Sequence, residues 1–360
     1  MNINALSTSL KAGQVALIIS ETNRLYFTEF DSSDGFLLVS NLGAIFITDS
    51  RYIEAAEKSI KNCKVLLQKS GKDFYEQLVS SVKSLGGKSV LIEASRLSVS
   101  QANFYEQLFA ENRLKINTTN KLDDLISELR IIKSEEEKAK IAKAQKIAEK
   151  AYKNILPMIK PGVKEVEIAA ALDFEMRKLG ASAPSFETIV AAGKNSSMPH
   201  AVPGATKVKS GDFVTLDFGA VFEGYHSDTT RTVAVGKISS EMANVYDIVR
   251  SSQKAGVLAL RAGISNRDAD KVCRDIIERA GFGDAFGHST GHGVGVEIHE
   301  APTLYSRAKK KVELKAGMVV TVEPGIYLPG KFGVRIEDML MITEEGSYNF
   351  VTLPKKLITL

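Results

Sequence analysis

The sequence predicts a mixed α/β (α+β) protein of two domains, and three observations lead to this prediction. Of its 360 residues, 44% are hydrophobic and 25% are charged, a composition typical of ordinary globular proteins. In the first third, apolar runs of strand length alternate with helical stretches. The remainder contains two similar halves, each a helix followed by a pair of strands. We therefore expect domains at residues 1–128 and 129–360.

The charge balance and the apolar runs argue against several classes of partner. The chain has 47 basic and 43 acidic residues, so no nucleic-acid partner is expected, and the run Lys309, Lys310, Lys311 is interpreted as a solvated loop. The longest apolar runs are far shorter than a membrane span, and the amino-terminal segment lacks a signal-peptide pattern. The two cysteines, Cys63 and Cys273, are far apart in the sequence. No disulfide framework is expected, and a cytoplasmic enzyme is predicted.

The first domain is predicted to be α/β, without evident chemistry. Strands are expected at 16–20, 35–40 and 44–48, and helices at 49–58, 72–84 and 98–110. No histidine falls in this part of the chain. Asp49 and Ser50 are interpreted as residues that start a helix.

A long amphipathic helix is expected to open the second domain. Ser134 followed by Glu137 forms a capping-box pattern. The apolar residues of one helical stripe are Ile141, Ala144, Ala148, Tyr152 and Ile155. Pro157 and the pair Pro161-Gly162 are expected to end the helix.

An internal repeat organises the rest of this domain. Segments 162–180 and 263–281 are each predicted to be a helix bracketed by glycines. The strings KSGDFVTLDFG and KAGMVVTVEPG follow, and each carries an acid six positions after its first glycine: Asp217 and Glu323. A turn and a second strand with another acid come next, Asp228 in one half and Glu337 in the other. A pseudo-two-fold arrangement of the halves would bring the four carboxylates to one point.

The register of the first hairpin places its two acids on one face. Glu223-Gly224 is a reasonable tight turn, so position 219 should face 228 and position 217 should face 230. Asp217 then lies diagonal to Asp228, and such neighbours are roughly 7–8 Å apart at the backbone.

The second hairpin is expected to turn at 328–331. Glu323 and Glu337 share a face only if the loop has an odd number of residues or the strand bulges. One of these two irregularities is therefore predicted.

Carboxylates within apolar strands are unfavourable to bury unless a cation neutralises them. The four acids and His292, which lies in a glycine-rich loop, have the composition of a carboxylate-dominated two-metal site. The alternative is that these acids only face solvent, and their duplicated context argues against it. His226 is expected to share a face with Asp228, in a structural or supporting role.

The motifs LDFGA, SDTTRT, GHGVG, EPGIY and RIED, in this order and spacing, resemble the metallopeptidases with the pita-bread fold, over about residues 130–355. The strings NRLYFTEF and TDSRY resemble the creatinase-type amino-terminal domain. Together they resemble the Xaa-Pro branch, with aminopeptidase P and prolidase. The methionine aminopeptidases typically lack counterparts of His288 and Arg335, and creatinase lacks the acidic set.

The resemblance implies roles for individual residues. The residues implied to bind two divalent metal ions are Asp217, Asp228, His292, Glu323 and Glu337, with Asp228 and Glu337 bridging the ions. The residues implied to contact or support substrate are His200, His288, His299, Tyr327 and Arg335. The mainly oxygen ligand set favours manganese, with cobalt, zinc and iron as alternatives.

The resemblance also implies the reaction, which is hydrolysis of the bond between an amino-terminal residue and proline. Glu323 would accept the proton, and His299 with a metal would stabilise the oxyanion. His200 and His288 would position peptides that carry proline second. The alternatives are an Xaa-Pro dipeptidase and, in another class, a catalytically dead binding protein on the same fold. A homodimer is expected by analogy with the family.

Overall fold

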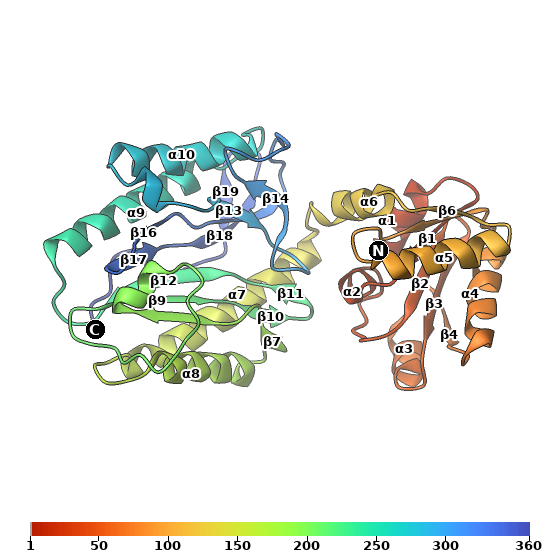
Figure 1. The fold of residues 1–360 in the computed structure, drawn as a ribbon, viewed down its shortest axis with the longest axis horizontal. Coiled ribbons are helices and arrows are strands. Elements are labelled where there is room, and N and C mark those ends of the chain that lie inside the picture. Colours follow the sequence, from red (N-terminus) through yellow and green to blue (C-terminus); the bar gives the residue numbers. More distant parts are fainter. Residues whose placement is uncertain (1) are drawn as a thin grey trace. The chain divides into compact units, whose positions relative to one another are not determined.

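The computed structural model describes residues 2–360, and the chain divides into two compact units, Met1–Arg130 and Ile131–Leu360 (Figure 1). Each unit is described by itself. Both cysteines are free thiols. Within residues 2–360, no helix combines the length and the apolar character needed to cross a bilayer. The cytoplasmic location stays a prediction.

The amino-terminal unit is built on a six-stranded mixed sheet with the strand order β4-β3-β2-β1-β5-β6. Neighbouring strands are antiparallel from β1 to β3, whereas β4, β5 and β6 each pair in parallel with their inner neighbour. The strands are β1 Gln14–Ile18, β2 Phe36–Ser40, β3 Gly43–Thr48, β4 Lys64–Leu67, β5 Ser89–Ile92 and β6 Lys115–Asn117.

Six helices accompany this sheet within the described part of the unit. They are α1 Asn2–Ser9, α2 Glu21–Thr28, α3 Ile53–Ser59, α4 Lys72–Ser84, α5 Val99–Glu111 and α6 Lys121–Arg130. Helices α4 and α5 bury Leu78, Val82 and Phe109 in one core with Val15 and Leu17 of β1. All three predicted strands and the last two predicted helices of this unit are close to the observed ones.

The predicted helix at 49–58 begins later than expected, at Ile53. Asp49 accepts the backbone N–H of Arg51 at 2.8 Å and also binds the Arg51 guanidinium, so it stabilises a turn ahead of the helix. Tyr52 occupies the N-cap position. Strands β4, β5 and β6 were not predicted, because runs of three or four residues carry little periodicity.

The carboxy-terminal unit opens with α7, Glu135–Ile155, as predicted. Ser134 and Glu137 form the capping box, in which the Glu137 backbone N–H donates to Ser134 Oγ at 3.2 Å. The predicted apolar stripe is fully buried, and a single turn of 3₁₀ helix at Leu156–Met158 ends the helix at the prolines.

The predicted repeat is present in the structure as two equivalent helices, α8 Glu165–Lys178 and α10 Asn266–Arg279. The glycines that bracket them have φ values of 96° and 104° in the first half and 85° and 86° in the second. Only glycine adopts this left-handed conformation without strain, which explains why both halves carry it at both positions.

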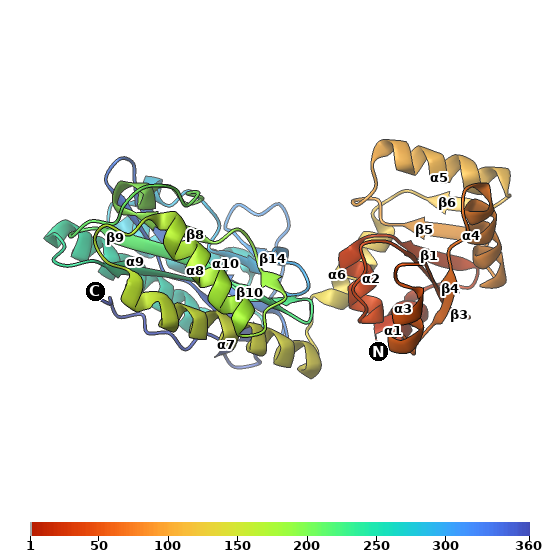
Figure 2. The ribbon, with the colours of Figure 1, turned by 90° about the horizontal axis from the view of Figure 1, so that it is seen from below.

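Strands between two helical layers form the rest of this unit. Figures 1 and 2 show α7 and α8 on one side of the strands and α9, Ser240–Ala259, with α10 on the other. The equivalent three-stranded sets are β8-β9-β12 and β13-β15-β18. Their strands are β8 Ile189–Ala192, β9 Phe213–Phe218, β12 Thr229–Ala234, β13 Gly291–Gly293, β15 Val319–Val322 and β18 Asp338–Ile342.

The remaining strands extend these sets or form hairpin tips. They are β7 Ala183–Pro184, β10 Ala220–Phe222, β11 Tyr225–His226, β14 Glu300–Leu304, β16 Gly325–Leu328, β17 Phe332–Arg335 and β19 Ser347–Asn349. The two halves meet where β12 passes the segment between β17 and β18. The Glu337 N–H donates to the Thr230 carbonyl at 3.1 Å, and Thr232 Oγ1 donates to the Arg335 carbonyl at 3.0 Å. The acid-bearing ends of both halves therefore lie together.

Candidate functional site

The first hairpin has the predicted register. Asp217 pairs with Thr230, and the turn residues Glu223 and Gly224 have φ values of 48° and 79°, as a type I′ turn requires. The two strands approach closely beside Asp228. A Cβ atom at Gly219 would lie 1.8 Å from the Ser227 carbonyl oxygen, so only glycine fits there. Asp217 and Asp228 consequently share one face, as predicted.

The second hairpin has the predicted odd loop. Leu328 pairs with Phe332, which leaves a loop of three residues, and the Lys331 N–H donates to the Leu328 carbonyl at 2.9 Å. Val322 pairs with Asp338 in the same continuous register. Glu323 and Glu337 therefore lie opposite each other and share a face.

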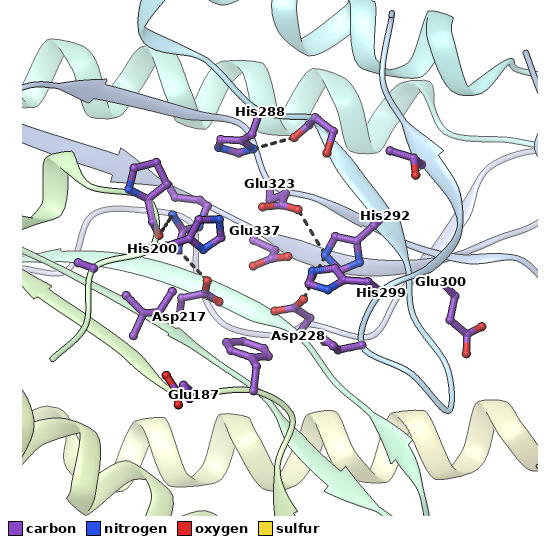
Figure 3. Close-up of a pocket in the computed structure, with 18 of the residues that line it drawn as sticks. Glu187, His200, Asp217, Asp228, His288, His292, His299, Glu300, Glu323 and Glu337 are labelled. Carbon is purple, nitrogen blue, oxygen red and sulfur yellow. Dashed lines mark hydrogen bonds and ion pairs between the residues drawn. The ribbon is translucent and has the colours of Figure 1, made fainter. Parts of the chain in front are cut away.

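One cavity of about 740 Å³ collects these acids and four of the five histidines (Figure 3). Its ionisable lining residues are Glu187, His200, Asp217, Asp228, His288, His292, His299, Glu300, Glu323, Arg335 and Glu337. All five predicted metal ligands are in this set. The apolar part of the lining includes Phe186, Ile189, Val202 and Ile298.

The tightest cluster in the cavity is formed by Asp228, His292 and Glu337, whose ligand atoms all lie within 4.8 Å of one another. His292 Nε2 is 3.5 Å from Asp228 Oδ2 and 3.5 Å from Glu323 Oε1. His292 Nδ1 lies 3.0 Å from the Gly293 carbonyl, which can only accept, so Nδ1 carries a proton. Burial opposes the charged ring, but Asp228 and Glu323 raise the pKa of His292 to about 9, so Nε2 is also protonated beside the carboxylates. A bound metal ion would displace the Nε2 proton and take its place between these groups.

Asp217 completes the acidic set from the other side. Arg335 Nη2 donates to Asp217 Oδ2 at 2.7 Å, while Oδ1 is buried and has no hydrogen-bond partner. A buried carboxylate oxygen without a donor is unfavourable, and a cation would satisfy it. Four carboxylates and one imidazole therefore fit divalent metal ions chemically.

The electrostatics of the acids support the same interpretation. Burial, and then the charge of Asp217 against the opposing effect of His292, raises the pKa of Asp228 to about 6. Burial and the Asp228 charge raise the pKa of Glu323 to about 7, and burial with all three other acids raises the pKa of Glu337 well above its ordinary value. These groups repel one another when ionised, and bound cations would relieve that repulsion.

Arg335, Tyr327 and His288 form a chain of hydrogen bonds behind the acids. Arg335 Nη1 donates to the Tyr327 hydroxyl at 2.9 Å, and that hydroxyl lies 2.9 Å from His288 Nε2. His288 Nδ1 contacts the Ser289 carbonyl at 2.8 Å, so Nδ1 is the protonated nitrogen and Nε2 accepts from Tyr327. Burial and then Arg335 lower the pKa of His288 to about 4, so the ring is neutral.

These hydrogen bonds restrict the roles of two predicted residues, His288 and Tyr327. Both His288 nitrogens are engaged by the protein, so the ring presents its carbon atoms to the cavity. Tyr327 is not among the cavity-lining residues, although it was predicted to contact substrate, and it holds His288 and Arg335 instead.

The other two cavity histidines, His200 and His299, are both exposed at the cavity. His299 lies beside His292, with ring centroids 4.3 Å apart, and partial burial followed by the charge of His292 lowers its pKa. His226 lies outside the lining. Its backbone N–H donates to the Gly295 carbonyl at 2.9 Å, and its Nδ1 is buried without a hydrogen-bond partner, so the supporting role of its side chain stays a prediction.

The structure adds residues that the sequence analysis did not single out. Glu300 lines the cavity and forms an ion pair at 3.1 Å with Lys133, and the two side chains are 5% and 1% exposed. The position of Glu300 directly after His299 was the only sequence signal for it. Asp270 and Arg274 of α10 hold the loop that carries His288.

Comparisons with known families identify the class. The profile of Metallopeptidase family M24 matches residues 139–344, and that of the Creatinase/Prolidase N-terminal domain matches residues 6–132. The chain belongs to metallopeptidase family M24. The predicted family, fold class and metallopeptidase activity are confirmed, and membership of this family implies divalent metal ions.

Individual relatives span nearly the whole chain. The Uncharacterized peptidase YqhT of Bacillus subtilis is 42% identical over 344 residues, covering 96% of this chain and 95% of the relative. The solved Xaa-Pro dipeptidase from Bacillus anthracis is 40% identical with a TM-score of 0.93, covering 100% of this chain and 99% of that one. The X-Pro aminopeptidase from Thermotoga maritima is 35% identical with a TM-score of 0.90, covering 99% and 100%.

Proposed function

We propose that this protein is a dinuclear-metal Xaa-Pro aminopeptidase, which removes an amino-terminal residue that precedes proline. The observation that carries the proposal is the convergence of Asp228, His292 and Glu337 to within 4.8 Å in a cavity that the other predicted ligands also line. The similarity to a dipeptidase and an aminopeptidase that both act at Xaa-Pro supports the choice of bond.

The residues that would hold two divalent ions are Asp217, Asp228, His292, Glu323 and Glu337. Four of the five ligands offer oxygen, which favours manganese, and cobalt, zinc and iron are the alternatives. When bound, the two ions would supply Lewis acidity and a water of lowered pKa.

The remaining chemistry is assigned to side chains of the cavity. Glu323 is proposed to hold and release a proton, since its pKa is raised to about 7 and Thr321 Oγ1 donates to its Oε1 at 3.3 Å. His299 is proposed to donate to the developing oxyanion. His200, exposed at the cavity, is proposed to orient the peptide, and Arg335 keeps Asp217 in place.

Proline in the second position removes the N–H of the scissile amide, so the enzyme must recognise shape in place of a hydrogen bond. The apolar lining residues Phe186, Ile189, Val202 and Ile298 offer such a surface. The His288 ring, whose nitrogens are already bonded within the protein, adds a flat neutral face.

The charge of the cavity favours the aminopeptidase over the dipeptidase. A dipeptide substrate carries its carboxylate next to the scissile bond, so it needs a cation in the cavity. Among the described lining residues, Arg335 is the only Lys or Arg, and it is already bound to Asp217 and Tyr327. Longer peptides place their carboxylate farther away and avoid this requirement.

Three substrates test the proposal with the manganese-loaded enzyme: Ala-Pro, Ala-Pro-amide and Ala-Pro-Ala. We expect kcat/KM to be highest for the tripeptide and to rise when the dipeptide carboxylate is amidated. Preference for free Ala-Pro over its amide would establish the dipeptidase. If no substrate is cleaved and Mn²⁺ still binds, the binding-protein alternative holds.

The domain roles and the assembly are also proposals. We assign the creatinase-type domain to residues 1–128 and the catalytic domain to 129–360, which agrees with the profile matches at 6–132 and 139–344. A homodimer is proposed by family analogy. Light scattering coupled to size-exclusion chromatography tests it, and a mass of one chain would contradict it.

A further inference from the structure

Helix α10 carries a buried charged pair that the proposed chemistry does not use. Arg274 Nε donates to Asp270 Oδ2 at 2.9 Å, and Nη2 donates to Oδ1 at 2.9 Å, so the pair is bidentate. The Asp270 side chain is 0% exposed and that of Arg274 is 13% exposed. A surface pair at this helical spacing contributes little, but a buried pair must be fully hydrogen-bonded to be tolerated.

Asp270 receives the rest of its hydrogen bonds from the segments that border the cavity. It accepts the Thr290 N–H at 3.0 Å, the Thr290 hydroxyl at 2.7 Å and the Ser306 N–H at 2.9 Å. Thr290 lies midway between His288 and His292 in the sequence, and its carbonyl accepts the Glu323 N–H at 2.8 Å. Asp270 therefore ties the histidine loop to the helix.

Arg274 holds the same loop at its other end. Nη1 donates to the Phe286 carbonyl at 2.9 Å, and Nη2 donates to the His288 carbonyl at 2.7 Å. The guanidinium also lies over the Phe286 ring, 4.3 Å from its centroid. The two carbonyls flank Gly287, which has the least restricted backbone of any residue type. Without these bonds, the backbone at Gly287 would be less restrained, and only the hydrogen bonds to Tyr327 and Ser289 would hold the His288 ring.

We propose that Asp270 and Arg274 are positioning residues, which fix the His288 ring against the cavity and thereby set the affinity for the peptide substrate. Asp270 and Arg274 lie at fixed distances after Gly263, the glycine that precedes helix α10. At the same distances after Gly162, which precedes helix α8, the residues are Ala169 and Asp173. The pair therefore belongs only to the half that carries the histidine loop. Its effect on turnover rests on the proposed function.

The first test is a comparison of Arg274→Gln, Arg274→Lys and the control Arg279→Gln. Arg279 lies on the same helix, is exposed and donates only to a backbone carbonyl, that of Asp275. We expect Arg274→Gln to raise KM for Ala-Pro-Ala about tenfold with a smaller change in kcat, and Arg274→Lys to recover part of the loss. Mn²⁺ affinity, measured by calorimetry, should match the wild type in every variant. Unchanged KM in a folded Arg274→Gln would overturn the proposal.

A double-mutant cycle with His288→Phe then asks whether Arg274 acts through His288. If it does, Arg274→Gln combined with His288→Phe has the KM of His288→Phe alone. Fully additive effects would contradict the proposal, because they would mean that Arg274 acts by another route.

Histidine ¹⁵N NMR gives a readout that needs no turnover. His288→Phe assigns the Nδ1–H signal of His288, and we expect Arg274→Gln to shift or broaden that signal while Arg279→Gln leaves it unchanged. If wild-type protein cleaves no proline peptide but the signal responds, the proposed function fails and the positioning role stands. If the enzyme is active and the signal does not respond, the positioning role fails. A poorly folded Arg274→Gln leaves Arg274→Lys for the same measurement.

Discussion

The buried ion pair between Lys133 and Glu300 offers the sharpest stability prediction. Its atoms are 3.1 Å apart and its side chains are 1% and 5% exposed, so neither charge can be solvated if the other is removed. The backbone N–H of Lys133 donates to the Gly317 carbonyl at 2.9 Å. This bond keeps the backbone in place when the Lys133 side chain is changed. Lys133→Met should therefore remove the lysine charge that the buried Glu300 carboxylate pairs with and cost about 3–5 kcal/mol.

For a unit of this size, each kcal/mol lowers Tm by about 2–4 °C, so Lys133→Met should lower it by about 6–20 °C. The assay is differential scanning calorimetry of the full chain, in which the transition of the carboxy-terminal unit is followed. Urea unfolding monitored by circular dichroism supports it. Lys133→Met combined with Glu300→Gln should recover much of the loss, since it removes both charges. The chosen control is Lys271→Met, because that lysine is exposed and paired only at 3.6 Å with Asp275. A double variant no more stable than Lys133→Met alone would refute the reasoning.

Three further predictions concern the acidic cavity. Glu337→Ala should reduce kcat roughly a thousandfold or more, because it removes a proposed metal ligand, while the circular dichroism spectrum stays unchanged. Near-normal turnover in this variant would mean that the reaction takes place at another site. Mn²⁺ affinity should fall by about tenfold or more per pH unit below pH 7, because the pKa values of Asp228 and Glu323 are raised to about 6 and 7 and the metal must displace their protons. Calorimetric titration with Mn²⁺ at pH 5.5, 6.5 and 7.5 measures the affinity, and an affinity independent of pH would contradict the prediction. Gly219→Ala should lower the free energy of unfolding by about 1–3 kcal/mol and also weaken Mn²⁺ binding, because the added Cβ would lie 1.8 Å from the Ser227 carbonyl oxygen, beside Asp228. The control is Gly330→Ala at a hairpin tip, where a Cβ meets no atom within 4 Å, and this variant should bind Mn²⁺ normally.

The sequence was sufficient wherever a local rule decides the structure. A capping box depends on residues three apart, so Ser134 and Glu137 could be recognised in one string. The period of two along a strand decides which side chains share a face, so the turn at Glu223-Gly224 was enough to pair Asp217 with Thr230. The same parity argument required the three-residue loop of the second hairpin. The repeat then indicated that both pairs of acids belong to one site.

Contacts between distant segments were decided only by the tertiary structure. Lys133 and Glu300 are 167 residues apart, and Arg335 is 118 residues from Asp217, so no local pattern relates them. The roles of His288 and Tyr327 depend on the contact between His288 Nε2 and the Tyr327 hydroxyl, and packing of the folded chain determines that contact. Sequence periodicity specifies the face on which a side chain lies. The partner that it meets there is selected by the close packing of the two halves, because that packing determines which charges are buried together.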